Sequence, residues 1–409
     1  MIGPNKCLAA VLRTLSTEMK ALQIYAGPKA MAHLGRYGLR PQDVSTMAAA
    51  AGGPKGLILG PLDRFIFGQW LPQSSQAVHL VGASIGAWRM ASACLNDPVA
   101  AFERLEREYI GQHYDLLPGE KRPPASRVSA LFGANLQAFY DGRLAEVLQH
   151  PRYALHVLTS HGRGLLSRER HGLTALGYVG AFLSNLLARR ALGPWLERVV
   201  FSSGPGTGLP DLPFVAHDYP TQQVALTEAN FQAALQASCS IPFVLQAVHD
   251  IADAPAGAYW DGGVTDYHLH LDYAGVQNAL DSRATQAYSI IATEQNHIKD
   301  ARASDHTAGL VLYPHFQRSV VPGWLDKHLS WRHGSTPFLD IMVLLAPNPD
   351  WVKTLPNGKL PDRGDFMHYG ADLIARMNAW NAAVSACHQL ADEFAAWLEQ
   401  PDLSKVRLL

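Results

Sequence analysis

Residues 78–88 read V-H-L-V-G-A-S-I-G-A-W, and they carry the clearest indication of the fold class. The apolar run 78–83 predicts a short buried strand, and a helical pattern runs from Ile85 to Leu95. Ser84 lies between them in a G-x-S-x-G pattern. A nucleophilic serine needs a sharp turn that exposes its Oγ, and small neighbours let strand and helix approach there. An ordinary glycine-flanked turn between a strand and a helix is the alternative.

A second glycine-rich turn lies upstream, at residues 51–56 (A-G-G-P-K-G), before an apolar helical pattern over 57–66. Successive backbone N–H groups in such a turn form a cradle for an oxyanion. Pro54 has no N–H, so Gly53 and Gly52 are the expected donors, with the N–H of Lys55 as an alternative to that of Gly52. The stretch lacks the G-x-x-x-x-G-K-[ST] pattern of a phosphate-binding loop. A tight turn that caps a helix is the alternative.

A third turn, Asp261-Gly262-Gly263, follows a short predicted strand at 258–260. Two glycines after an aspartate let the backbone turn sharply, which aims the carboxylate back along the end of the strand. Asp-Gly is also a common hairpin dipeptide, so this motif alone would equally indicate a simple hairpin.

The composition is that of a large globular protein. The chain has 409 residues, of which 48% are hydrophobic and 17% charged, and this excludes a wholly disordered chain. The formal net charge of -1 provides no basic field, which excludes nucleic acid as a partner. The four cysteines form no C-x-x-C pair, which favours reduced thiols and a cytoplasmic location. No stretch reaches the ~18–20 apolar residues of a membrane span.

Strand and helix patterns alternate along the chain, which predicts an α/β fold. Further strands are expected at 196–201, 287–293, 309–313 and 341–345, and residues 97–195 are expected to be mostly helical.

The chain is expected to form one elaborated domain over residues 19–409. Its motif core would span about 45–275, and a C-terminal elaboration would occupy 285–409. Residues 1–18 are expected to be a disordered extension, because Arg13 interrupts their apolar run and no cleavage site follows.

The C-terminal part contains a predicted long helix from Leu373 to Leu398, with apolar residues recurring every three or four positions. We expect this face to pack on its own domain. A coiled-coil dimer is the alternative use of such a seam.

Together the three turns resemble the patatin-like phospholipase family, which combines a glycine-rich oxyanion loop, a G-x-S-x-G elbow and a D-G-[GA] motif in this order. Residues 237–242 (A-S-C-S-I-P) also resemble that family's small-residue helix end before an Ile-Pro pair. The resemblance covers about residues 45–270. It implies a three-layer α/β/α fold with a mostly parallel central sheet, and a dyad of Ser84 and Asp261 without histidine. The family commonly has arginine where this chain has Lys55.

The dyad is chemically reasonable by itself. Asp261 would accept the proton of Ser84 as its Oγ attacks an ester carbonyl, and Gly52 and Gly53 would stabilise the oxyanion. A carboxylate with the ordinary pKa of ~3.9 is a poor base, but partial burial would raise that pKa. The sequence therefore predicts a serine acyl-ester hydrolase that acts on lipid or fatty-acyl esters and needs no cofactor.

Other arrangements could carry chemistry. If their segment is extended, Asp266, His268, His270 and Asp272 share one face and could bind a divalent metal in a metal-dependent hydrolase. A hydrogen-bonded strand face is the simpler interpretation. A histidine downstream of Asp261 could complete a Ser–Asp–His triad. A lipid-binding protein without activity is a further alternative.

The uncharged stretch from Leu173 to Ala188 predicts a helix. Five arginines bracket it: Arg163, Arg168, Arg170, Arg189 and Arg190. We prefer a core helix with charged ends, and an interfacial helix that makes peripheral membrane contact is the alternative.

Overall fold

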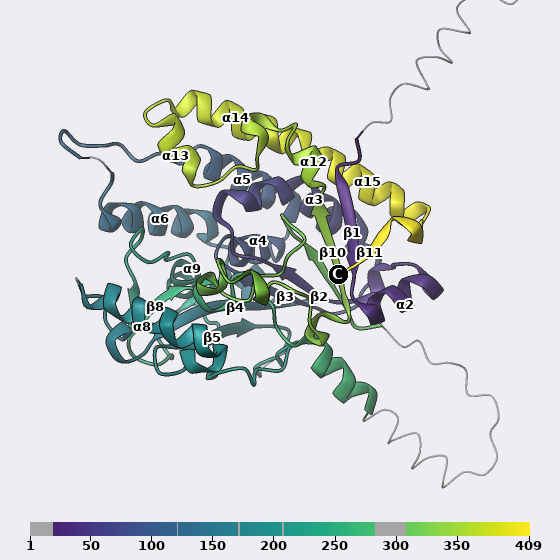
Figure 1. Cartoon of the computed structure of the whole chain (residues 1–409), viewed down its shortest axis with the longest axis horizontal. Helices are drawn as coiled ribbons and strands as arrows, with labels where there is room; N and C mark the ends of the chain where they lie inside the picture. Colours follow the sequence, from purple (N-terminus) through teal and green to yellow (C-terminus); the bar gives the residue numbers. More distant parts are fainter. Residues whose placement is uncertain (1–18, 121, 171, 207, 283–307) are drawn as a thin grey trace, which may run out of the picture.

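The computed structural model describes residues 19–120, 122–170, 172–206, 208–282 and 308–409. Within these ranges, eleven strands form a mostly parallel sheet with helices on both sides (Figure 1). Parallel strands need long crossover connections, and their helices cover both faces of the sheet. The three-layer α/β/α fold expected from the sequence is confirmed.

The main path of the sheet has the order β11-β1-β10-β9-β2-β3-β4-β5-β6. In that order the strands are Val406–Leu408, Leu22–Ala26, Met342–Pro347, Leu310–Pro314, Val44–Ala49, Val78–Ala83, Tyr153–Gly162, Leu196–Ser203 and Thr221–Ala225. Two more, β7 (Val248–His249) and β8 (Ala258–Asp261), pair with each other, and β8 also pairs with β4.

Five predicted strands are confirmed: 78–83 as β3, 196–201 as β5, 258–260 as β8, 309–313 as β9 and 341–345 as β10. The strand expected at 287–293 lies outside the described residues.

The expectation of a mostly helical block over 97–195 missed a central strand. This block does contain α5 (Pro98–Ile110), α6 (Ala125–Tyr140), α7 (Leu144–Leu148) and α8 (Leu173–Leu187). Between α7 and α8, however, β4 lies in the middle of the sheet, and all of its residues are buried. A strand covered on both faces has no alternation of polar and apolar residues, which hides it from pattern reading.

The helical pattern over 57–66 is divided among three kinds of helix. A 3-10 helix, Gly53–Leu59, leads into α3 (Gly60–Phe65), and a π-helical turn, Ile66–Trp70, follows. Pro61 occupies the first turn of α3, where its fixed φ is suited to starting a helix.

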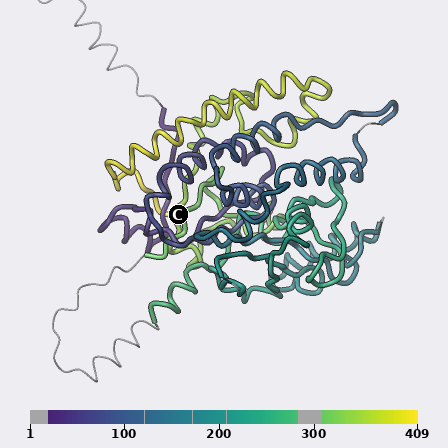
Figure 2. The backbone as a smooth tube through the Cα atoms, turned by 180° about the vertical axis from the view of Figure 1, so that it is seen from behind, coloured from purple at the N-terminus to yellow at the C-terminus, as the bar shows by residue number. Residues whose placement is uncertain are grey.

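The long C-terminal helix is in fact two helices, α14 (Leu373–Ala386) and α15 (His388–Glu399), which meet at Cys387. Figures 1 and 2 show them as one yellow band along one side of the molecule. Their apolar seam packs on the same chain: Phe394 is fully buried, and its ring lies 6.1 Å from that of Phe65. The preferred packing is confirmed, and the coiled-coil alternative is wrong because the seam is already covered.

Candidate active site

Ser84 forms the sharp turn between β3 and α4 (Ile85–Ala93). Its φ of 57° and ψ of -129° are rare for a residue with a side chain, and this is the strained geometry of a nucleophile elbow. The glycines on each side are sterically required. A Cβ on Gly82 would clash with Ala87, and a Cβ on Gly86 would clash with the carbonyl oxygen of Ala49.

Asp261 reaches Ser84 along one edge of β4. The other edge of β4 is occupied by β5. On the shared edge, β3 runs parallel to β4 and ends with Ala83 opposite Leu158. Beyond it, β8 runs antiparallel to β4 and ends with Asp261 opposite Thr159. The two strands therefore approach each other end to end, and their last residues face neighbouring positions of β4.

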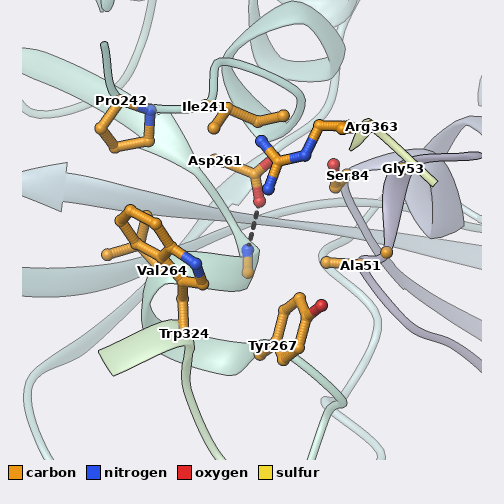
Figure 3. A pocket seen from close by; sticks show the side chains of 12 residues that line it. Ala51, Gly53, Ser84, Ile241, Pro242, Asp261, Val264, Tyr267, Trp324 and Arg363 are labelled. Carbon is orange, nitrogen blue, oxygen red and sulfur yellow. Dashed lines mark hydrogen bonds between the residues drawn. The ribbon is translucent and has the colours of Figure 1, made fainter. Parts of the chain in front are cut away.

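The carboxyl group of Asp261 is buried in this junction. Its Oδ1 accepts a hydrogen bond from the backbone N–H of Gly263 at 2.7 Å (Figure 3). Burial raises the pKa of Asp261 to about 6, although hydrogen bonds from Ser84 and Gly263 and the charge of Arg363 oppose the rise. A carboxylate with this pKa is a stronger base than an exposed aspartate and is still ionised at neutral pH.

Gly52 and Gly53 line the same pocket. The φ of Gly53 is 56°, in the left-handed region that favours glycine. A Cβ on Gly52 would clash with the ring of Phe316. The 3-10 helix begins at Gly53, so the N–H groups of these two glycines are not used by the helix. Neither N–H has a hydrogen-bond partner among the described residues, so both can donate to a ligand oxygen.

Residues 237–242, which the sequence singled out, support the elbow. Here α9 ends (Phe231–Ser238), and Ser238 Oγ accepts a hydrogen bond from the N–H of Ser84 at 3.0 Å. The same hydroxyl donates to the carbonyl oxygen of Leu158 in β4 at 2.7 Å. This stretch thus ties the backbone of the elbow to the central strand, and the Ile-Pro pair that follows lines the pocket.

The pocket collects residues from distant parts of the chain (Figure 3). Its lining consists of Ala51, Gly52, Gly53, Ser84, Ile241, Pro242, Asp261, Gly263, Val264, Tyr267, Trp324 and Arg363. The structure therefore brings together all four residues predicted for the site. Sequence reasoning missed Tyr267, Trp324 and Arg363. The last two lie far downstream of the three motifs and belong to no recognisable pattern.

Lys55 is not one of the lining residues. Its Nζ lies 5.3 Å from the centroid of the Phe316 ring, a cation–π arrangement. Burial lowers the pKa of Lys55, and the neighbouring charges of Lys327 and Arg363 lower it further. Positive charge thus gathers beside the glycine-rich loop.

The metal-binding interpretation of residues 266–272 is corrected by the structure. Asp266 ends the helical turn α10 (Gly263–Asp266), so the segment does not begin as the extended strand that the interpretation required. Its buried carboxylate accepts hydrogen bonds from Arg198 at 2.6 Å and from Arg189 at 3.0 Å. Two guanidinium groups neutralise it and would repel a metal cation. Across the described ranges, no group of three or more His, Cys, Asp or Glu side chains is placed to hold a metal ion.

Among the described residues, no histidine lines the pocket. Burial lowers the pKa of His268 well below its usual range, and that of His315 to about 3, so both are neutral. His270 lies 3.3 Å from the hydroxyl of Thr336. His297 and His306, two further histidines downstream of Asp261, lie outside the described residues.

The helix predicted at 173–188 is confirmed as α8, but its preferred burial is wrong for one face. Six large apolar side chains are exposed: Leu173, Leu176, Val179, Leu183, Leu186 and Leu187. The buried side of α8 carries Tyr178, whose ring meets the exposed Phe243 edge-on at 5.7 Å. Phe243 directly follows the pocket residue Pro242, so α8 packs beside a loop that lines the pocket. In the part of the chain that the structure describes, no helix is both long and apolar enough to cross a bilayer.

Comparison with known proteins identifies the same region. The family model for patatin-like phospholipases matches residues 52–268, just over half of the chain. The matched range starts at the glycine-rich loop and includes Ser84 and Asp261. No curated protein matches the chain. On this sequence match and this fold, the chain belongs to the patatin-like phospholipases, a family that acts on lipid esters.

Proposed function

We propose that this protein is a serine acyl-ester hydrolase that releases fatty acids from lipid esters, with Ser84 as nucleophile and Asp261 as base. One observation carries the proposal. The strained elbow of Ser84, the buried carboxyl of Asp261 with its raised pKa, and the N–H groups of Gly52 and Gly53 line a single pocket.

The first half of the reaction transfers the acyl group to the enzyme. Ser84 Oγ attacks the ester carbonyl carbon while Asp261 accepts its proton. Negative charge develops on the carbonyl oxygen, where the N–H groups of Gly52 and Gly53 would stabilise it. When the tetrahedral intermediate collapses, Asp261 returns the proton to the leaving alcohol, and the acyl group remains on Ser84.

The second half repeats these roles with water. Asp261 removes a proton from a water molecule, whose oxygen attacks the acyl carbon. Collapse of the second intermediate breaks the bond to Ser84 Oγ, and Asp261 returns the proton to that oxygen. The products are a free fatty acid and the starting enzyme, so one aspartate serves as base and acid in both halves.

A fluorophosphonate probe tests the nucleophile. We expect covalent labelling that maps to Ser84 and is absent in Ser84→Ala, together with a loss of ester turnover by several orders of magnitude. Circular dichroism should show that the variant is folded. A folded Ser84→Ala protein that keeps more than about a tenth of wild-type turnover would exclude Ser84 as nucleophile. An unlabelled wild type that binds lipid without hydrolysing it would favour a non-catalytic lipid-binding protein.

We further propose that the exposed apolar face of α8 contacts a membrane peripherally. The helix itself carries no acidic residue, and the exposed Arg170 and Arg190 lie at its two ends. An apolar face with basic ends fits the surface of an anionic bilayer. Such contact would bring the pocket to its lipid substrate. We propose a cytoplasmic location, which the buried free thiols of Cys94, Cys239 and Cys387 favour.

A further inference from the structure

Arg363 is a pocket residue that the family match does not cover. It lies almost a hundred residues beyond the end of the matched range, just before α13 (Gly364–Tyr369). Its side chain runs along the glycine-rich loop, with Cγ only 3.8 Å from where a Cβ on Gly53 would lie. Figure 3 shows its guanidinium in front of the Asp261 carboxyl, close to Ser84. The C-terminal part of the chain thus places a planar cation beside the reacting groups.

The guanidinium of Arg363 makes no hydrogen bond or ion pair with any of the described residues. The adjacent Asp362 instead pairs with Lys359, at 2.9 Å. Lys359 also binds the buried Asp365, at 2.6 Å, so both of these carboxylates pair with Lys359. Arginines that serve only the fold usually donate to carboxylates or carbonyls, as Arg198 does here. Arg363 keeps its donors available.

The charges around Arg363 favour an anion. Lys55 and Lys327 lie near enough for their charges to influence one another, and Arg363 adds to the same positive region. Asp362 is the acidic group that acts against this charge at Lys55. The pocket lining is also partly apolar: Figure 3 shows Pro242, Val264 and Trp324 on the side away from the guanidinium, and Ile241 beside it. A ligand with an apolar chain on one side and an anionic group on the other matches this division.

We propose that Arg363 determines specificity by binding the phosphate group of a phospholipid whose ester lies at Ser84. This inference rests on the proposed hydrolase function. The guanidinium offers two parallel N–H donors that match a pair of phosphate oxygens, a geometry that lysine cannot provide. The acyl chain then extends toward the apolar side, and the carbonyl oxygen lies at the N–H groups of Gly53 and Gly52.

Two substrates that differ by one phosphate test this role. Dihexanoyl phosphatidate and dihexanoylglycerol carry the same acyl chains, and both are used as monomers in solution. We expect Arg363→Gln to lower the ratio of their kcat/KM values, phosphatidate over diacylglycerol, by about tenfold or more, since hydrogen bonds to charged groups are the strong ones. The same ratio for Arg363→Lys should lie between those of the wild type and Arg363→Gln. Both substrates should be measured at a pH well above 6, where Asp261 is ionised, because the charge of Arg363 also lowers the pKa of Asp261.

Arg36→Gln is the matched control. It removes the same charge from an exposed position in α2 (Pro28–Tyr37), which packs on strands at the far edge of the sheet, and should leave the ratio unchanged. An unchanged ratio in Arg363→Gln, or an equal loss with both substrates, would overturn the proposal. If the ratio were unchanged in Arg363→Gln but competitive inhibition by inorganic phosphate disappeared in that variant, the bound group would be reassigned to free phosphate rather than a lipid phosphate.

A binding measurement separates this proposal from the hydrolase function. Calorimetric titration of dihexanoyl phosphatidate into Ser84→Ala needs no turnover. We expect Ser84→Ala combined with Arg363→Gln to bind it about tenfold more weakly than Ser84→Ala alone. Equal affinities would refute the role of Arg363 even in an active enzyme. A difference in affinity would sustain it even if the wild type hydrolysed neither ester.

Discussion

At the scale of single residues, the reaction depends on how a carboxylate becomes basic enough to activate an alcohol. Asp261 achieves this through burial at the end of β8 rather than through a charged partner. Its interactions with Ser84, Gly263 and Arg363 limit the shift, so the carboxylate is still ionised at neutral pH. The pKa of Asp261 therefore results from its buried location, because the same aspartate on the surface would have an ordinary pKa.

This balance predicts the pH dependence. Asp261 must be ionised to accept a proton, so kcat/KM for a soluble ester should rise with pH, with a midpoint at about 6, and level off above it. The measurement is a pH–rate profile with a short-chain ester. A profile that is flat from pH 5 to 8, or that falls over that range, would contradict Asp261 as the base.

The variant Asp261→Asn provides the control for this prediction. It should lose nearly all turnover and yet be more stable than the wild type above pH 6. The folded-state pKa is raised, so wild-type stability falls as the pH rises from about 4 to about 6, and asparagine removes this cost. Thermal unfolding at pH 8 should therefore show a higher Tm for the inactive variant. An active Asp261→Asn would contradict the dyad.

At the scale of elements, α8 shows how one helix serves two environments. Its buried side includes Gly177 and Ala181, small residues that allow close packing, while its leucines face outward. Arg189, just beyond the helix, is not a free surface charge. It donates hydrogen bonds to the carboxylates of Asp218, Asp266 and Asp326, so replacing it would disturb the fold. Tests of membrane contact should leave it in place.

The membrane prediction therefore concerns two leucines. Leu176→Gln combined with Leu183→Gln should weaken binding to vesicles of anionic phospholipid by about tenfold or more, because two apolar side chains no longer enter the interface. Co-sedimentation measures this binding. Turnover of a soluble ester should be unaffected, whereas turnover of long-chain lipid in vesicles should fall.

The control uses two exposed leucines outside α8. Leu403→Gln combined with Leu408→Gln makes the same chemical change near the C-terminus and should leave vesicle binding as it is. If the α8 variant bound vesicles as tightly as this control, α8 would not be the contact surface.

At the scale of the whole molecule, the C-terminal strands complete the sheet of the family core. β9 pairs with β2, and β10 lies between β9 and β1. β1 has β11 as its other neighbour, so both of its partners come from beyond residue 308. We therefore propose that residues 19–409 fold as one domain, in which the C-terminal part is integral.

A truncation tests this proposal. A chain that ends at Ser282 lacks β9, β10 and β11, so it exposes one edge of β2 and leaves β1 unpaired. It should be insoluble or lack a cooperative thermal transition, because unpaired strand edges aggregate. A chain without residues 1–18 should unfold at the same temperature as the full-length protein. Cooperative unfolding of the truncated chain at the full-length Tm would show that residues 19–282 form a separate domain.

The local conformations of the site follow from short stretches of sequence. The elbow at Ser84, the turn at Gly52–Gly53 and the strand end at Asp261 depend on nearest neighbours, because glycine provides the backbone freedom that each turn requires. That these three turns meet follows from tertiary packing and not from local sequence. The turns at Ser84 and Asp261 meet through the register of β3 and β8 along β4, which is buried on both faces and so has no recognisable pattern. The turn at Gly52–Gly53 joins them because β2, which precedes it, pairs with β3.

The features that the sequence did not predict also depend on tertiary packing. Arg363 enters the pocket because a distant segment folds back over the glycine-rich loop, and local spacing does not encode such a contact. Asp266 was a plausible metal ligand by its alternation with two histidines, until helical geometry and two arginines gave it a structural role. The side of α8 that faces water likewise depended on which neighbours cover it. Composition and periodicity describe the chain, but burial and charge pairing are properties of the packed whole.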